Sequence, residues 1–420
     1  MRSRMMRVQY QATGAALMHK VAFAVVRLAI VLVSVLCASQ ALLAQDYRVL
    51  YTFTGRADGG YPAGNLLRDA QGNLYGTTYS GGTHSNGVIF KLDVTGKETV
   101  LHSFHTREGI DANGGLVQDQ AGNLYGTAFY GGSRQCDLGC GTLFKLSNTG
   151  KLTVLHVFTG GADGNNPASG LVRDPAGNLI GITYRGGGGP CDVQGTPGCG
   201  VIFKLNPSTG QYSVLYSFTG GTDGSNPHAD LIQDASGNLY GTASYSGTPG
   251  CGCGTVFKLD AHGRYAVLYS FAGGADGGTP AAGVLRDAAG NLYGTTYFAG
   301  DFSCDSRGCG TLFKLTPASR LIVLHTFKGL RTLTGQGEGA NPEQDLVQDN
   351  AGALYSMALD GGVNDGGVLF KLNPHRREKV LHSYASGWSF GGLVPDNQGH
   401  LYGTTYNTGL GNGTVFSVAP

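Results

Sequence analysis

Six acidic residues recur at one fixed position of a repeated sequence, and carboxylates can bind cations or the hydroxyl groups of sugars. Each acid precedes a glycine and lies eleven residues before an aspartate that opens a tight turn. The six are Asp58, Glu108, Asp163, Asp223, Asp276 and Glu338. If the copies surround an axis, the acids form a ring at one mouth of a central channel, where they bind a cation or a hydroxyl-rich ligand. The alternative is that each carboxylate only caps its own turn.

The seventh copy differs, because it has Ala385 in place of the acid and also carries the single tryptophan, Trp388. An aromatic ring beside a gap in the acids can stack on a sugar ring, and core packing is the other interpretation. The spacing of the acids does not match a calcium-binding EF-hand loop. We therefore predict no cofactor, apart from the alternative of a divalent cation at the channel mouth.

Eight cysteines form four pairs, and the second member of each pair lies in a Gly-Cys-Gly sequence. The pairs are Cys136 with Cys140, Cys191 with Cys199, Cys251 with Cys253, and Cys304 with Cys309. Three other copies have Asn86, Gly366 and Asn412 at the position of the second cysteine, so neither a core nor a catalytic requirement explains the pairs. An even number of cysteines in an exported chain favours disulfides over a zinc site. We predict that these disulfides are optional staples of the loops between the second and third strands and that the cysteines bind no metal. Cys251 and Cys253 are separated by one residue, so a strained or a reduced pair is the alternative there.

The sequence predicts no catalytic residue. It contains no G-x-S-x-G elbow, no H-E-x-x-H zinc motif and no P-loop. One position in the last strand of a copy alternates between histidine and tyrosine, which is typical of packing at an edge strand and not of a general base. The residues are His102, His156, His325 and His382, and Tyr51, Tyr216 and Tyr269.

An enzyme built on a symmetric ring has to break the symmetry, since its chemistry needs different groups facing one substrate. The residues that break the repeat are His84, Arg107, Asp301, the insert Leu330–Gln336, Asp360 and Trp388. If they cluster around one channel mouth, they favour an enzyme. If they are scattered over the rim, they favour a binding protein.

The composition excludes some classes of partner and predicts a folded, β-rich chain. The chain has 420 residues, of which 14% are charged, and a formal net charge of +1, so it lacks the basic surface that nucleic acid requires. Glycine is abundant, with 72 residues, but 41% of the chain is hydrophobic, which argues against disorder. Many glycines and aromatic residues with no helical periodicity indicate short strands and tight turns.

The first 44 residues read as a secretory signal peptide. Basic residues precede the apolar run Leu28–Ala44, and small residues come just before Gln45. The signal would also be complete if translation began at Met18. An uncleaved membrane anchor is the alternative, because the run is nearly long enough to span a bilayer. We expect export, with no lipid on Cys37 and no membrane span once the signal is removed.

Residues 45–420 consist of seven copies of about 50 residues, the length of one β-propeller blade. A glycine in the turn marks each copy, at Gly72, Gly122, Gly177, Gly237, Gly290, Gly352 and Gly399. In the first copy, alternating apolar residues predict four strands. Their ranges are Asn65–Asp69, Asn73–Tyr79, Gly87–Asp93 and Glu98–Phe104.

The two ends of the repeated region predict how the ring closes. Tyr47–Phe53 matches the fourth strand of a copy, whereas Gly413–Val418 matches a third strand. The last copy therefore lacks its fourth strand, and the first segment supplies one. Pairing these strands removes the open edges that invite aggregation. We predict an all-β, seven-bladed propeller with four-stranded antiparallel blades.

The pattern "LYGTTY-x-GG … G-x-[VIL]-F-K-L … VL-[HY]-S-F" resembles the tandem repeat of secreted bacterial proteins known as GloVer-repeat proteins. The resemblance runs from about Tyr47 to the C-terminus. Members of that family carry a separate C-terminal anchoring or sorting segment. Here the chain ends two residues after its last expected strand, so we expect no such anchor. The resemblance implies a secreted repeat protein and no particular activity.

These features together favour an exported, non-enzymatic binding module that uses the loop face around the central channel. Its ligand would be a glycan or a protein, and we expect the module to be a monomer. One alternative is an extracytoplasmic enzyme that acts on carbohydrates or lactones, since propellers host such chemistry. The other is a purely structural protein of the cell envelope.

Overall fold

The computed structural model describes residues 46–193, 196–304, 306–329, 338–363, 365–385, 391–407 and 411–419. The expected signal peptide, the insert Leu330–Gln336 and Trp388 lie outside these residues. Tyr47–Pro420 forms one compact unit. In the part of the chain that the structure describes, no helix is long and apolar enough to cross a membrane.

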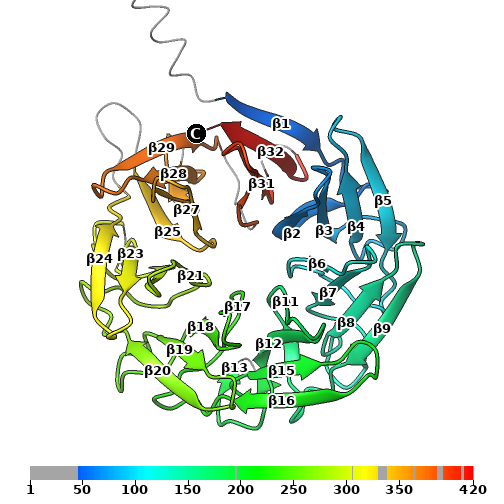
Figure 1. Ribbon diagram of the computed structural model, residues 1–420, viewed down its shortest axis with the longest axis horizontal. Helices are drawn as coiled ribbons and strands as arrows, with labels where there is room; N and C mark the ends of the chain where they lie inside the picture. The colour runs from blue at the N-terminus through cyan, green and yellow to red at the C-terminus, as the bar shows by residue number, and fades with distance from the viewer. Residues whose placement is uncertain are drawn as a thin grey trace, which may run out of the picture. The chain divides into compact units, whose positions relative to one another are not determined.

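Seven small antiparallel sheets surround a central axis, so the prediction of a seven-bladed β-propeller is confirmed (Figure 1). Blade one contains β2 (Gly60–Arg68), β3 (Leu74–Ser80), β4 (Val88–Leu92) and β5 (Glu98–Ser103). Blade two contains β6 (Val117–Gln118), β7 (Leu124–Ala128), β8 (Thr142–Leu146) and β9 (Leu152–Val157). Blade three contains β10 (Asn165–Pro167), β11 (Val172–Arg173), β12 (Leu179–Arg185), β15 (Val201–Leu205) and β16 (Tyr212–Ser217).

The remaining blades follow the same order from the axis outward. Blade four contains β17 (Ile232–Gln233), β18 (Leu239–Ala243), β19 (Thr255–Leu259) and β20 (Tyr265–Ser270). Blade five contains β21 (Leu285–Arg286), β22 (Leu292–Thr296), β23 (Thr311–Leu315) and β24 (Leu321–Thr326). Blade six contains β25 (Gly339–Pro342), β26 (Val347–Gln348), β27 (Leu354–Gly361), β28 (Val368–Leu372) and β29 (Glu378–Ser383). A separate hairpin in blade three contains β13 (Asp192–Val193) and β14 (Thr196–Pro197).

Blade seven combines the two ends of the repeated region, as the sequence predicts. It contains β30 (Val394–Pro395), β31 (Leu401–Thr405), β32 (Thr414–Ala419) and, as its outer strand, β1 (Asp46–Thr52). Figure 1 shows β1 beside β32 at the outer edge of the ring. The backbone N–H of Phe53 donates to the carbonyl of Gly413 at 3.0 Å. Pairing between the ends therefore closes the ring.

The hydrophobic core lies between neighbouring blades. The third strand supplies a fully buried phenylalanine, such as Phe90 in β4, whose ring packs edge-on against Phe53 at 5.1 Å. Gly76 in β3 faces this ring, and a Cβ at Gly76 would lie only 2.6 Å from the phenylalanine. The recurring Tyr-Gly-Thr sequence therefore leaves room for the core aromatic residue.

In each blade, an aspartate at the start of the turn after the first strand accepts hydrogen bonds from the residues of that turn. Asp69 accepts hydrogen bonds from the backbone N–H groups of Gln71 and Asn73, the Asn73 amide and the Tyr75 hydroxyl, at 2.7–3.1 Å. Burial alone would raise the pKa of Asp69, but these hydrogen bonds together lower it below its usual value. The same carboxylate turn recurs at Asp119, Asp174, Asp234, Asp287, Asp349 and Asp396.

Candidate functional site

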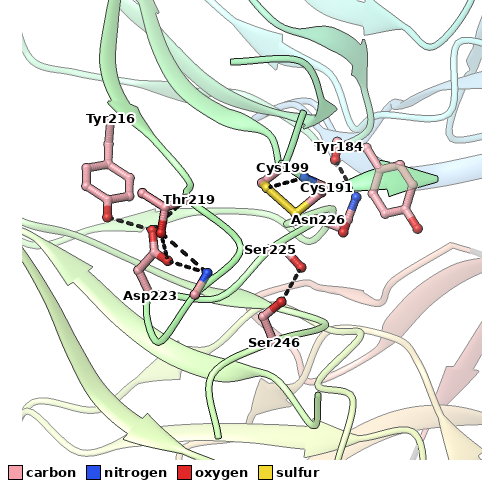
Figure 2. The surroundings of a disulfide bond; sticks show 10 residues. Tyr184, Cys191, Cys199, Tyr216, Thr219, Asp223, Ser225, Asn226 and Ser246 are labelled. Atoms are coloured by element: carbon pink, nitrogen blue, oxygen red, sulfur yellow. Dashed lines mark hydrogen bonds between the residues drawn. A yellow bond between two sulfur atoms is a disulfide. The ribbon is translucent and has the colours of Figure 1, made fainter. Parts of the chain in front are cut away.

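Five of the six acids predicted to form a ring instead make hydrogen bonds with the outer strand of the preceding blade, and the sixth, Glu338, lies 3.8 Å from His325 of that strand. Asp223 is representative: it accepts hydrogen bonds from the Tyr216 hydroxyl at 2.8 Å, the Thr219 N–H at 2.8 Å and the Thr219 hydroxyl at 2.5 Å (Figure 2). Tyr216 belongs to β16, the outermost strand of blade three. The carboxylate therefore lies at the periphery and not at the axis.

The position that alternates between tyrosine and histidine supplies the partner of these acids. Tyr51 and Tyr269 donate to Asp58 and Asp276 in the same way as Tyr216 donates to Asp223. Where the position is histidine, the ring nitrogen takes the role of the hydroxyl, as in the 2.8 Å hydrogen bond between His102 and Glu108. The bond between His156 and Asp163 measures 3.1 Å. The two sequence patterns thus describe one hydrogen bond between an outer strand and the next turn.

These contacts correct the expected placement at the channel mouth. Among the described residues that line the central cavity, none of the six acids occurs. The connection between blades starts at the outer strand, and the acid comes so early in this connection that it stays beside that strand. Ligand binding by the six acids stays a prediction, and so does any contribution of Trp388.

The four predicted cysteine pairs are disulfides in the structure. The Cα–Cα distances are 5.3 Å for Cys136–Cys140, 5.0 Å for Cys191–Cys199, 5.1 Å for Cys251–Cys253 and 5.4 Å for Cys304–Cys309, all within the usual range. Each pair lies against a glycine of the turn that the next acid caps. At Gly220, for example, a Cβ would lie 2.5 Å from the sulfur of Cys191. The disulfides therefore join the loop between the second and third strands to the capped turn.

The burial of the second cysteine in each pair corrects the prediction that no core requirement explains the pairs. Cys140, Cys199 and Cys309 are fully buried and are part of the hydrophobic core between blades. Cys253 is half-buried and packs against the same kind of core. These cysteines are buried because each of the four comes two residues before a buried third strand. The replacements in other blades therefore do not exclude a core role.

A cavity of about 390 Å³ lies on the axis of the ring. Its lining comes from six of the blades and from the tyrosine that follows β31 of the seventh. The lining residues include Asn65, Tyr79, Asp111, Asn113, His228, Asp230, Glu343, Asp345 and Tyr406. A second cavity of about 460 Å³ shares Asn113, His228 and Glu343 with the first and is also lined by Tyr184, Tyr245 and Tyr297. We call the two together the central cavity.

Three side chains meet across the axis. The Asn65 amide of blade one donates to Asp230 of blade four at 2.9 Å and to Asp345 of blade six at 2.8 Å. Its carbonyl oxygen accepts from the N–H of Gly392 in blade seven at 2.7 Å. The second oxygens of Asp230 and Asp345 accept from the N–H groups of Gly170 and Gly283 at 2.6 and 2.7 Å. We call Asn65, Asp230 and Asp345 the axial triad.

The two carboxyl groups of the axial triad lie close together and are half-buried beside the cavity. Burial raises the pKa of Asp230, and the charge of Asp345 raises it further. Burial also raises the pKa of Asp345, although its hydrogen bonds with Asn65 and Gly283 oppose the change. The triad therefore holds protons more tightly than exposed aspartates do.

Asp111 supplies a third buried carboxyl group on the cavity wall. It has a positive φ of 57°, and six blades have a non-glycine residue with positive φ at this position. In blades three, four and six the residue is asparagine, and its amide donates to a carbonyl of the preceding blade, as Asn166 does to Phe129 at 3.0 Å. One oxygen of Asp111 makes no hydrogen bond with any described residue. Burial raises the pKa of Asp111 to about 7.

Glu343 and His228 occupy the same position in blades six and four, six residues before the turn aspartate. The other described blades have alanine or asparagine there, at Ala63, Asn113, Ala168 and Ala281. Burial, followed by the charge of Asp360, raises the pKa of Glu343 to about 7. His228 is hydrogen-bonded through Nδ1 to the Ser244 hydroxyl at 2.9 Å, and burial lowers its pKa. The cavity therefore combines protonatable acids with a neutral imidazole.

The sequence interpretation missed this cavity, although the alignment of the copies contains a signal for it. Four residues before the turn aspartate, the copies read Asn65, Gly115, Gly170, Asp230, Gly283, Asp345 and Gly392. Three large polar residues interrupt a run of glycines that otherwise lies on the axis. Of the residues singled out for breaking symmetry, His84 and Arg107 do not line the cavity, and the charge of Asp360 raises the pKa of Glu343.

Solved structures similar to this chain share its fold. A streptogramin B lyase has a TM-score of 0.56 at 12% identity, with 89% of this chain and 97% of the lyase covered. The extracellular domain of a one-component system from B. thetaiotaomicron has a TM-score of 0.53 at 9% identity, covering 89% of this chain and 40% of that one. A gluconolactonase from Xanthomonas campestris has a TM-score of 0.41, which is too low to carry an argument. No curated protein matches the sequence.

The sequence profile of one repeat family matches residues 40–192 and 189–416, which together span most of the chain. The two matches include all seven blades. This result confirms the resemblance that the repeated motifs indicate. The chain belongs to the Gloeobacter/Verrucomicrobia repeat family, and it is a seven-bladed β-propeller.

Proposed function

We propose that the protein is an exported binding module whose central cavity holds a small, hydroxyl-rich ligand such as a sugar. The observation that carries this proposal is the concentration of unrepeated polar residues on the cavity wall. Asp111, Glu343 and His228 come from three different blades and line the same cavity. A concave site with a few convergent polar groups is the usual form of a small-molecule site.

The chemistry of the lining fits hydroxyl groups. A carboxyl group with a pKa near 7 can donate a hydrogen bond when protonated and accept one when ionised. Tyr79, Tyr184, Tyr245, Tyr297 and Tyr406 supply aromatic surface beside these groups, and such surface packs against the apolar faces of sugars. The disulfides support a location outside the cytoplasm.

Calorimetric titration with a panel of neutral, acidic and amino sugars tests the proposal. The informative variants are Asp111→Asn and Glu343→Ala, because Asn166 and Ala63 occupy the same positions in other blades. We expect at least one sugar to bind saturably, and each variant to weaken binding at least about tenfold, the loss of one charged hydrogen bond. Glu98→Leu is the matched control, since Glu98 is a buried acid between outer strands and should not affect binding.

Two results would overturn the proposal. Binding that survives both cavity variants but disappears in Asp58→Ala and Asp276→Ala would place the site at the six peripheral acids. Silence across the whole panel would favour a purely structural role in the envelope. The titration is repeated with calcium and magnesium, because the peripheral acids are also the residues expected to hold a divalent cation.

An enzyme that acts on carbohydrates or lactones is the second candidate. It is favoured by the juxtaposition of Glu343, with a pKa of about 7, and neutral His228 in one cavity, because general acids and bases work best near the ambient pH. Incubation with lactones under pH-stat control measures acid release directly. Turnover that requires Glu343 would replace the binding proposal, and quantitative recovery of unchanged lactone would eliminate this candidate.

A further inference from the structure

The junction between blades five and six contains three unsatisfied ligand atoms that face one another. His325 belongs to β24, Glu338 to the connection between the blades, and Glu378 is the first residue of β29. One nitrogen of His325 and one oxygen of each glutamate lie within 4.8 Å of one another. We call these three residues the junction cluster. It lies between outer strands and shares no residue with the central cavity.

The atoms of the junction cluster are buried without hydrogen-bond partners. His325 Nε2, Glu338 Oε2 and Glu378 Oε1 make no hydrogen bond with any described residue. The side chain of Glu378 is only 4% exposed, that of His325 is 13% exposed and that of Glu338 is 35% exposed. Burial, followed by the charge of Glu338, raises the pKa of Glu378 to about 7. The two glutamates keep backbone hydrogen bonds with Gly339 and Lys328, but a buried carboxylate oxygen without a partner still carries a desolvation penalty.

In other blades the corresponding histidine and acid lie closer together, so the gap between them in the junction cluster is specific to this junction. His102 and His156 each face one acid and approach it to 2.8 and 3.1 Å, close enough for a direct hydrogen bond. His325 faces two acids, and its Nε2 lies 3.8 Å from an oxygen of each. These distances are too long for hydrogen bonds. They are near the separation of about 3.4 Å between two ligands of one ion at about 2.1 Å.

At most other junctions, the residue in the position of Glu378 is a tyrosine or a leucine. It is Tyr47, Tyr212 or Tyr265 at three junctions, where the ring stacks on the residue in the place of His325. The hydroxyls of Tyr212 and Tyr265 donate to a backbone carbonyl at 2.6 Å. It is Leu152 or Leu321 at two others. Only at the junctions of Glu98 and Glu378 is it an acid, and Glu98 faces Tyr51 in place of a histidine.

We propose that His325, Glu338 and Glu378 bind a divalent cation of the Zn²⁺ type, which joins blade five to blade six. One imidazole and two carboxylates suit zinc and similar borderline cations, and water completes the coordination on the partly exposed side of Glu338. The cation would connect the two outer strands where other junctions use a tyrosine stack. The charge of Lys328 acts on His325 and Glu338 and opposes cation binding. This inference does not depend on the proposed function.

Isothermal titration of the EDTA-treated full-length protein with ZnCl₂ tests the proposal, with CaCl₂ as the comparison. We expect one tight zinc site, with much weaker binding of calcium. His325→Tyr and Glu378→Leu should each weaken zinc binding at least about tenfold, since even the loss of a residue that only orients a metal ligand costs as much. Lys328→Gln should strengthen binding. Glu98→Leu is the matched control and should leave the zinc affinity unchanged.

The variants place residues that other junctions already contain, so they are compatible with the fold. Glu378→Gln provides a second variant that removes the charge and keeps the volume. The thermal unfolding temperature, measured with and without zinc, gives an independent readout: zinc should raise it in the unmodified protein and not in the three cluster variants. The absence of a tight site, or equal zinc binding in His325→Tyr, Glu378→Gln and the unmodified protein, would overturn the proposal.

Discussion

The aspartate of the turn after the first strand and the residue four positions before it differ in how much they vary among the blades. The turn has the same aspartate in all seven blades, and this aspartate makes nearly the same hydrogen bonds each time. At the inner end, Asn65, Asp230 and Asp345 alternate with glycines. Residues that serve their own blade can be identical, whereas residues that meet on the axis have to differ.

The axial triad shows why the residues on the axis cannot be identical in all seven blades. Seven copies of one side chain at this position would bring seven equal groups to one point. Seven aspartates would repel one another, and seven glycines would leave the axis open. Asn65 resolves the conflict, because its amide donates to both acids while its carbonyl oxygen accepts from Gly392. Asymmetry is thus a structural requirement at the centre, and it also provides a cavity with varied chemistry.

Removal of the Asn65 side chain should have the largest effect on stability. In Asn65→Ala, two half-buried carboxyl groups each lose one of their two hydrogen bonds, and the N–H of Gly392 loses its acceptor. We expect the free energy of unfolding to fall by about 3–5 kcal/mol, because two hydrogen bonds to carboxyl groups and one from a backbone N–H are lost together. Denaturant titration followed by circular dichroism measures the loss.

Asn86→Ala is the control for this prediction. Asn86 makes only hydrogen bonds of 3.3 Å near the surface, so its loss should cost less than about 1 kcal/mol. Equal stability of the two variants would show that the axial triad contributes nothing beyond an ordinary surface amide. The comparison between centre and periphery would then fail.

The sequence predicts the repeated part of the molecule well for a physical reason. Each copy performs the same local task, so the turn aspartate, the buried Phe90 position and the closing strand Tyr47–Phe53 can be recognised from one copy or from the ends. The central cavity could not be predicted in this way. Asn65 meets partners that are 165 and 280 residues away, and this contact exists only after the ring has closed.

The misplaced acids have a related cause. The sequence assigns Asp58 and its counterparts to the correct connection between blades, but this connection runs from the outer strand to the axis. Only two residues lie between Glu108, which binds His102 of the outer strand, and Asp111, which lines the cavity. The position of a residue along such a connection decides its distance from the axis, and the spacing of the repeats does not reveal that distance.

Replacement of Asp111 should change how stability depends on pH. The folded state holds the Asp111 proton up to a pH of about 7, whereas the unfolded chain releases it near 3.8. Stability from this group is therefore full below pH 3.8 and falls as the pH rises toward 7. Asp111→Asn stays neutral at every pH, so it should be more stable than the unmodified protein at pH 8 by about 2–4 kcal/mol.

The two proteins should differ little at pH 4, which provides an internal control for the Asp111 measurement. The groups that face Asp111 in the cavity are Tyr79 and Tyr406, and the charge of Asp111 raises the pKa of both tyrosines, so neither is charged at pH 8. Thermal unfolding at pH 4, 6 and 8 gives the profile. A difference that does not depend on pH would show that folding does not raise the pKa of Asp111.

The turn aspartates should respond to pH in the opposite direction. Hydrogen bonds lower the pKa of Asp69 and Asp287 in the folded state, so their contribution is present above pH 3.8 and is lost as the pH falls through the lower folded pKa. Asp69→Ala should cost about 1–2 kcal/mol at pH 7, because the turn is partly exposed and solvent screens its charge. The cost should shrink below pH 3.

Asp287→Ala provides the matched measurement for Asp69→Ala in another blade. Because the two turns share the hydrogen bonds from the asparagine N–H, the asparagine amide and the tyrosine hydroxyl, denaturant titration should give nearly the same loss of stability for both variants. Losses that differ by more than about 1 kcal/mol, beyond the usual context dependence of one hydrogen bond, would contradict the idea that turn residues act only within their own blade.

The smallest effect is expected where the repeat itself interchanges two residue types. Tyr216→His replaces a hydroxyl that donates to Asp223 by an imidazole, and His156 already makes the same contact with Asp163. Both rings also stack on a tyrosine of the next blade, at centroid distances of 3.9 and 4.0 Å. We expect a change in the free energy of unfolding of less than about 1 kcal/mol by denaturant titration. A larger loss would mean that each junction requires its own tyrosine or histidine. Residues at the periphery would then be as specific to one blade as the residues on the axis.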